Sequence, residues 1–215
     1  MRITKDFHIH NCISKDGTGS FDDIAAAAKS AGLTKFAITN HSFNHKYGRW
    51  ENDYEFVRAE CKRVGAVFGI EADIYRKDGR LGGVRGREFE LVVAGFHRSP
   101  NWGRAFFGTK KGNTQMYINT IQKNKIDILA HLNTYIKVDC KAVAEVAASR
   151  GVLIEINGKR VDFTHQEFLD MQSTGVKFII NSDAHCPSGV GKPTAAYEFL
   201  KGVKFNPKQI VNLAK

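Results

Sequence analysis

The chain of 215 residues lacks any long hydrophobic run. No apolar stretch approaches the roughly 18 residues that a membrane-spanning helix requires, which argues against a helical membrane protein. The N-terminal sequence MRITKDFHIH is predicted to enter a strand at once, which leaves no room for a signal peptide. We therefore expect a soluble, cytoplasmic protein with no membrane partner.

Cysteine is scarce and scattered along the chain. The four residues, Cys12, Cys61, Cys140 and Cys186, include no CxxC pair, so they indicate free thiols and exclude a disulfide framework or a zinc knuckle. Tracts rich in glycine and proline, low-complexity segments and internal repeats are also missing. Because 42% of the residues are apolar, we expect a single domain over residues 1–215 with a substantial core.

Acidic residues are outnumbered, and the net charge is +10. Residues 75–111 hold nine basic side chains against three acids. Such an excess favours an anionic partner, either a phosphorylated metabolite or a nucleic acid, although solubility alone could also explain it.

Short apolar runs alternate with helical patterns. Strands are predicted near 6–10, 35–39, 67–70, 91–96, 126–130, 152–156 and 177–181. Helices are predicted near 20–31, 51–64, 113–124, 139–149, 164–174, 193–201 and 207–214. This alternation indicates parallel strands with helical crossovers, in either a nearly closed barrel or an open doubly wound sheet. No GxGxxG motif follows the first strand, so the dinucleotide-binding fingerprint is absent.

Histidines and acids gather where the predicted strands end. The chain has eight histidines, of which His45 and His165 stand apart from the strand ends. Residues placed at strand exits, or just beyond one, are His8, His10, Asp16, His41, Glu71, His97, His131, Asp183 and His185. In a parallel barrel all these exits meet on one face, so we expect the nine side chains around a single cleft.

A metal cluster explains this grouping better than chance does. One histidine at a strand end is usually a hydrogen-bonded surface or core residue, but six imidazoles in one place would repel one another if they were protonated. Neutral imidazole and carboxylate without thiolate suit Zn²⁺, Mn²⁺ or Fe²⁺. Nine ligands exceed what one ion needs, so the sequence predicts two or three divalent ions, with a carboxylate such as Glu71 between them.

The sequence blocks resemble the PHP (polymerase and histidinol phosphatase) family. The matching segments, over about residues 5–191, are DFHIH, SKDG, AITNH, GIEAD, AGFH, ILAH, LIEIN and NSDAH, in the order found in that family. The stretches NTQMYINTIQ and KAVAEVAASRGVLIEIN look most like stand-alone bacterial PHP phosphatases. The resemblance implies an α/β fold, a distorted (β/α)7 barrel with a trinuclear metal centre at the carboxyl ends of the strands.

The resemblance also implies how the ligands are shared among the ions. The first ion would be held by His8, His10, Glu71 and Asp183, the second by Glu71, His97 and His131, and the third by Asp16, His41 and His185. A metal-bridging hydroxide held by Glu71, Asp183 and His131 would attack phosphorus in line. We expect Asp6 to support the ligands by orienting a histidine. Asn40 stands where aspartate commonly precedes the histidine after the second strand, so its amide would keep the hydrogen bonding near the ligands but lose a charge and any proton-accepting role. Leu132 stands where proline often follows the histidine of the fifth strand.

The sequence indicates the residues that contact the substrate less clearly than it indicates the metal ligands. The resemblance suggests that Arg160 faces the substrate phosphate, against the alternative of a surface arginine beside Asp162; Lys192, Lys46 and His45 are weaker candidates. The loop 97–112 mixes Trp102, Phe106 and Phe107 with basic residues and could be a substrate lid, a nucleic-acid surface or a hydrophobic flap.

Three functions remain open from the sequence. The first is a metal-dependent phosphomonoesterase for a small phosphorylated metabolite, such as a nucleotide or histidinol phosphate. The second is a nuclease or nucleotide phosphodiesterase that binds single-stranded nucleic acid. The third is an inactive, metal-stabilised scaffold, which loss of ligands would signal; none of the nine is lost.

Overall fold

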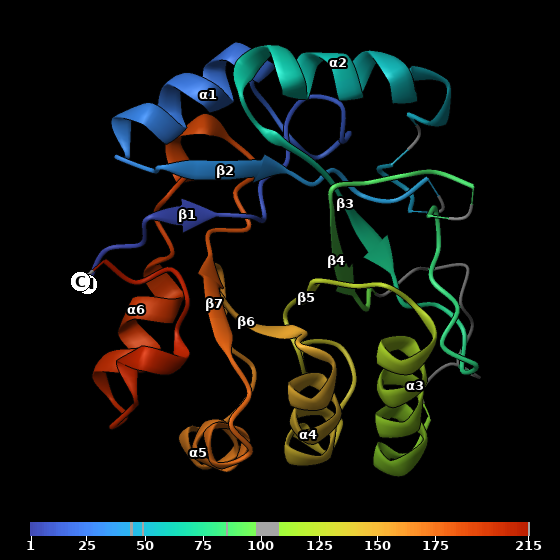
Figure 1. Ribbon diagram of the computed structural model, residues 1–215, viewed down its shortest axis with the longest axis vertical. Coiled ribbons are helices and arrows are strands. Elements are labelled where there is room, and N and C mark those ends of the chain that lie inside the picture. The colour runs from blue at the N-terminus through green and yellow to red at the C-terminus, as the bar shows by residue number, and fades with distance from the viewer. Residues whose placement is uncertain (44, 49, 85, 98–107, 215) are drawn as a thin grey trace.

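Seven parallel strands lie side by side in sequence order and curve into a nearly closed barrel (Figure 1). The computed structural model describes residues 1–43, 45–48, 50–84, 86–97 and 108–214. The strands are β1 Lys5–Asp6, β2 Lys35–Ile38, β3 Val67–Asp73, β4 Leu91–Gly95, β5 Ile128–Leu129, β6 Leu153–Asn157 and β7 Phe178–Asn181. Each pairs in parallel register with the next, so their carboxyl ends share one face. The predicted barrel architecture is confirmed.

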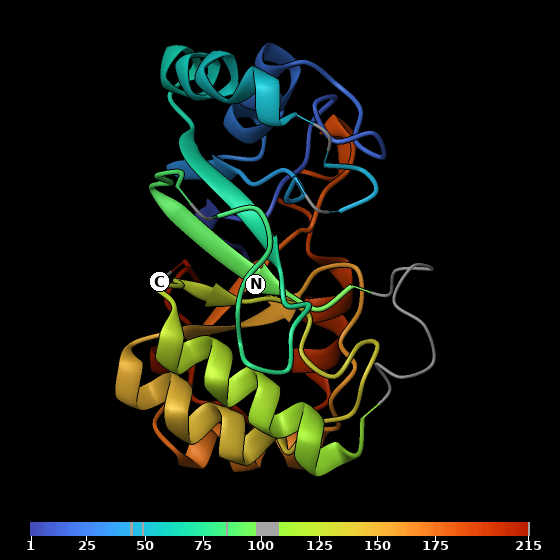
Figure 2. The same cartoon turned by 90° about the vertical axis from the view of Figure 1, so that its right-hand side faces the viewer.

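Helices cover the outside of the strands. They are α1 Phe21–Ser30, α2 Tyr54–Val64, α3 Lys110–Lys123, α4 Cys140–Arg150, α5 His165–Ser173 and α6 Thr194–Lys201, with 3₁₀ turns η1 Glu51–Asp53, η3 Pro187–Gly189 and η4 Pro207–Gln209. Figures 1 and 2 show α1 and α2 on one side and α3, α4 and α5 on the opposite side. No helix among the described residues is long and apolar enough to cross a lipid bilayer.

Local sequence signals set the helix ends. Ser20 and Asp23 form a reciprocal capping box at the start of α1, and Thr164 and Glu167 form another at α5. Asp139 caps the start of helix α4 by accepting the Ala142 N–H, and the helix ends at Gly151, whose φ of 69° is the left-handed conformation that glycine adopts readily. These caps fix where each helix returns the chain to the next strand.

The two ends of the chain depart from the predicted pattern. Regular strand pairing in β1 stops at Asp6, although the chain stays extended: Thr39 N–H donates to the Ile9 carbonyl and His10 N–H to the Ala184 carbonyl, both at 2.8 Å. The helix predicted over 207–214 is wrong, because only the turn η4 forms there. The residues after that turn form hydrogen bonds with strands of the barrel instead.

Asn212 closes the seam between β1 and β7. Its buried amide nitrogen donates to the Lys5 carbonyl at 2.7 Å and the Ile180 carbonyl at 2.6 Å, while its oxygen accepts the Ile180 N–H at 3.0 Å. The Asn212 carbonyl also accepts the Thr4 N–H at 2.8 Å. The Asn212 side chain thus supplies hydrogen-bond partners to backbone groups of β1 and β7, where the two strands do not pair with each other.

We expect Asn212→Leu to destabilise the protein strongly. The buried N–H and carbonyl of Ile180 and the partly buried carbonyl of Lys5 would lose their partner, and each loss at a buried group costs roughly 1–3 kcal/mol. Urea denaturation should show a large fall in the free energy of unfolding, whereas Val211→Thr at the exposed neighbour should change it little. An Asn212→Leu variant as stable as the parent would contradict this account of the seam.

Candidate metal centre

The nine predicted residues come together at the carboxyl ends of the strands. His8 and His10 follow β1, His41 follows β2, Glu71 lies near the end of β3, and His97 and His131 follow β4 and β5. Asp183 and His185 come from the loop after β7, and Asp16 from the loop before α1. All nine approach at least one other member of the set within 4.0 Å.

The carboxylate of Glu71 is the centre of this cluster. It is 1% exposed. Five imidazoles approach its two oxygens: those of His8 at 3.3 Å, His10 at 3.5 Å, His41 at 2.8 Å, His97 at 3.0 Å and His131 at 2.7 Å. No other carboxylate among the described residues approaches as many imidazoles.

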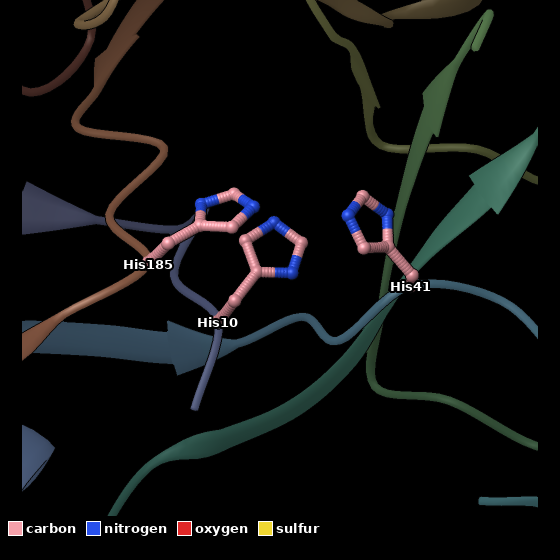
Figure 3. A group of neighbouring side chains, drawn as sticks. All are labelled: His10, His41 and His185. Atoms are coloured by element: carbon pink, nitrogen blue, oxygen red, sulfur yellow. The ribbon is translucent and has the colours of Figure 1, made fainter. Parts of the chain in front are cut away.

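Two further carboxylates extend the cluster. Asp16 Oδ2 lies 3.2 Å from His41 Nε2 and 3.3 Å from His185 Nε2. Asp183 Oδ1 lies 3.7 Å from His8 Nε2 and 3.6 Å from His10 Nε2. Figure 3 shows His10, His41 and His185 reaching the same space from three separate segments.

Several buried nitrogen and oxygen atoms of the cluster lack a hydrogen-bond partner in the described part of the chain and could therefore bind a cation. Buried side-chain atoms with no hydrogen-bond partner among the described residues include the following: His8 Nε2, both nitrogens of His10, His41 Nδ1, His131 Nδ1, Asp16 Oδ1 and Glu71 Oε2. Buried polar atoms are otherwise almost always hydrogen-bonded. Several groups of three side chains also hold ligand atoms within 4.8 Å of one another, among them His8, Glu71 and His131. The residues therefore fit divalent metal ions.

Burial and neighbouring charges shift the pKa values of Glu71 and His10. Burial opposes ionisation of Glu71, but the imidazoles of His97, His8 and His41 hold the pKa of its carboxyl well below the usual value. Burial lowers the pKa of His10 well below its usual value, and His41 and His185 add to the effect. The lowered pKa favours a neutral His10 ring, and neutral imidazole is the form that binds a metal ion.

Two acids that the strand-end reasoning missed orient the histidines. Glu155 in β6 accepts from His8 Nδ1 at 2.8 Å and from the His131 backbone N–H at 3.0 Å. Burial opposes its charge, but His8 and His131 lower the pKa of Glu155 to about 2. Asp73 in β3 lies 2.7 Å from His97 Nδ1. Each carboxylate keeps a proton on Nδ1 and so turns the Nε2 lone pair toward the cluster.

The backbone is adapted to the cluster at three residues. His131 with φ of 32° and Asp183 with φ of 53° are two of the three non-glycine residues with positive φ among those described. Such conformations persist only where surrounding contacts enforce them. Gly95 leaves room for the site, because a Cβ there would lie 2.6 Å from His131 Cε1 and 3.1 Å from Glu71 Oε1.

Asp6 acts differently from the prediction, whereas the Asn40 amide makes hydrogen bonds as expected. Asp6 accepts from the backbone N–H groups of Ser182 and Gly191, both at 3.0 Å, and its nearest contact with His8 is to the backbone N–H at 3.5 Å. It therefore holds the loop after β7 instead of a histidine ring. Asn40 donates to the Asn11 side-chain oxygen at 2.9 Å, a bond that an aspartate could not make.

A cavity of about 360 Å³ opens above the cluster. Arg160, Lys46, His45 and Tyr135 line it, together with Lys159, which the sequence reasoning missed. Lys159 lies two residues beyond the end of β6, and its Nζ lies 2.6 Å from His185 Nδ1 and 3.5 Å from Asp183 Oδ1.

Of the candidate substrate contacts, Arg160 lines the cavity and Lys192 does not. Arg160 pairs with Asp162 at 2.8 Å, yet its half-exposed guanidinium also lies over the Tyr135 ring. Lys192 is exposed outside the cavity, because Asp6 holds its neighbour Gly191 against the base of the loop. Most of the loop 97–112, including Trp102, Phe106 and Phe107, lies outside the described residues.

We expect Gly95→Ala to damage the site without unfolding the chain. The added methyl group would displace the His131 imidazole, so bound metal measured by inductively coupled plasma mass spectrometry should fall. Gly112→Ala in α3, where a Cβ meets its nearest neighbour at an ordinary 3.5 Å, should leave the metal content unchanged. Equal metal contents in the two variants would show that Gly95 has no such role.

Comparison with known proteins assigns the chain to a family. A model of the PHP domain matches residues 6–211. "Probable phosphatase YcdX" of Escherichia coli K12 is 28% identical over 97% of this chain and 89% of its own. A "Probable phosphatase" of Shewanella loihica is 28% identical over 99% and 90% of the two chains.

A solved structure shows the same fold. The histidinol phosphate phosphatase HISK of Lactococcus lactis, complexed with zinc, L-histidinol and phosphate, matches with a TM-score of 0.63 over 94% of each chain at 17% identity. The predicted resemblance is thus confirmed, and the chain belongs to the PHP domain family.

Proposed function

We propose that the protein is a metal-dependent phosphomonoesterase that hydrolyses a small phosphorylated metabolite. The observation that carries this proposal is the cluster itself, in which buried lone pairs of histidines and carboxylates face one another beneath a cavity with basic residues at its wall. The relatives named as phosphatases, and the bound phosphate in the Lactococcus lactis structure, support the same class of reaction.

The cluster suits two or three divalent ions of Zn²⁺, Mn²⁺ or Fe²⁺. Imidazole and carboxylate without thiolate favour these metals. Glu71, with imidazoles at both oxygens, would serve two ions, and Asp16 with His41 and His185 would hold a further one. Bound ions would neutralise charge on a phosphate ester and make water a nucleophile near neutral pH.

The remaining side chains of the cavity would bind and orient the ester. Arg160 and Lys159 follow β6 on one wall, and Lys46 lies in the loop after β2. A guanidinium and two ammonium groups suit an oxyanion. Arg160 lies 2.8 Å from Asp162, which limits its motion while one side of the guanidinium stays exposed. The cavity volume suits a small ligand such as a nucleotide or a compound like histidinol phosphate.

No observation among the described residues favours a nuclease. The aromatic and basic loop that suggested one lies outside the described part of the chain. A polymer substrate would also produce binding that weakens steeply with salt.

The test is a substrate panel with a ligand variant. Protein loaded with Zn²⁺ or Mn²⁺ should hydrolyse small phosphomonoesters, lose activity after chelation and regain it when metal is restored. It should not cleave labelled oligonucleotides. His131→Ala should lower kcat by at least about 100-fold, since even residues that merely orient ligands cost 10–100-fold when changed.

The matched control is His165→Ala. His165 is exposed on α5 and contacts Phe199 outside the cavity, so its loss should leave kcat unchanged. Retained turnover in His131→Ala would refute the catalytic role of the cluster. Cleavage of oligonucleotides in preference to monoesters would favour the nuclease, and no hydrolysis with any metal would favour the scaffold.

A further inference from the structure

His45 is a buried histidine at the cluster that belongs to none of the expected ligand sets. Its ring centroid lies 4.0 Å from that of His41 and 4.8 Å from that of His97, and it is 8% exposed. Ligand atoms of His41, His45 and His97 lie within 4.8 Å of one another, so proximity alone would allow a cation there. The hydrogen-bond partner of Nδ1 in each ring argues against His45 as a ligand of such a cation.

The partner of Nδ1 sets which nitrogen carries the proton. His8 Nδ1 faces Glu155 and His97 Nδ1 faces Asp73, and an acceptor at this position keeps the proton on Nδ1 and leaves Nε2 free to bind metal. In His45 the partner is a donor, because the Tyr47 backbone N–H points at Nδ1 from 3.4 Å. The Nδ1 lone pair is therefore occupied, and Nε2 carries the hydrogen.

The loop that carries His45 holds the ring in this position. His45 N–H donates to the Ser42 carbonyl at 2.9 Å, and Gly48 N–H donates to the His45 carbonyl at 3.0 Å. The turn requires glycine at position 48, since a Cβ there would lie 1.8 Å from the Ser42 carbonyl oxygen. Trp50 Nε1 donates to the His41 carbonyl at 2.8 Å and fixes the start of the loop.

The surroundings favour a neutral ring. No carboxylate among the described residues lies within 4.0 Å of either nitrogen of His45, whereas His8, His10, His41, His97, His131 and His185 each have one that close. Two imidazoles flank the ring instead. An N–H without a formal charge can approach a phosphate next to bound cations without repelling those cations.

We propose that His45 is a substrate-binding residue of the phosphatase site, which donates a hydrogen bond from Nε2–H to a phosphoryl oxygen and binds no metal ion. The inference rests on the proposed function for the identity of the ligand. It assigns His45 to the lining of the cavity, which Lys46, Tyr47, Tyr135 and Arg160 share. The hydrogen bond would stabilise negative charge on the phosphoryl group in the ground state and the transition state alike.

The test uses two variants of His45 in metal-loaded protein. Glutamine can reproduce the neutral donor at the position of Nε2, whereas leucine has a comparable volume and no donor. We expect all variants to keep the metal content of the parent. His45→Leu should weaken binding of inorganic phosphate, measured by isothermal titration calorimetry, by about 10- to 100-fold, as expected for one hydrogen bond to a charged group. His45→Gln should stay within about threefold of the parent, with His165→Gln as the matched control.

The possible outcomes separate this inference from the proposed function. Loss of one metal ion in both variants would make His45 a ligand and overturn the inference. Unchanged phosphate affinity in a folded His45→Leu protein, or no affinity in the parent, would also overturn it. If the parent binds phosphate but hydrolyses no monoester, the proposed activity fails, and the pattern across the His45 variants still tests the hydrogen bond.

Discussion

The structure is organised around a carboxylate that is buried among imidazoles. Glu71 is almost without contact with water and has five histidines within 3.5 Å. An ionised carboxylate in that position is costly unless positive charge compensates it, and a cluster of protonated imidazoles would repel itself. Divalent ions resolve both problems, since they bring the charge while the imidazoles stay neutral. The same ions would make the site reactive toward phosphate esters.

The barrel supplies the geometry that the cluster needs. Parallel strands bring their carboxyl ends to one face, but the ligands also require deviations from regular structure. His131 and Asp183 adopt positive φ, and Gly95 leaves the space that the His131 ring fills. Acids within the strands then fix the rings, Glu155 for His8 and Asp73 for His97. His45 is the exception, because its Nδ1 accepts a hydrogen bond from the Tyr47 backbone N–H, which leaves the ring hydrogen on Nε2 for the donor role that we propose.

Local patterns predicted the parallel strands and all nine clustered residues, whereas the choice of a barrel over an open sheet came from the resemblance to the PHP family. Apolar runs mark the strands, and the polar residues that end them must share a face. Glu155 was missed because it lies inside β6, and Asp73 because β3 continues past the predicted strand end at residue 70. Each nevertheless alternates with another polar residue: Glu155 with Asn157, and Asp73 with Glu71. The alternation that identified His8 and His10 would have found them. Asn212 had no such signal, since its partners Lys5 and Ile180 are distant in sequence.

The most direct test of the account is to locate the ions. A crystal of zinc-loaded protein, measured at the zinc absorption edge, should show anomalous difference peaks next to the Glu71 carboxylate, with the Nε2 atoms of His8, His97 and His131 directed at them. No peak should lie at His45. An ordered cluster with no anomalous signal, its histidines and Glu71 joined by direct hydrogen bonds alone, would contradict the central claim that bound cations balance the buried charge.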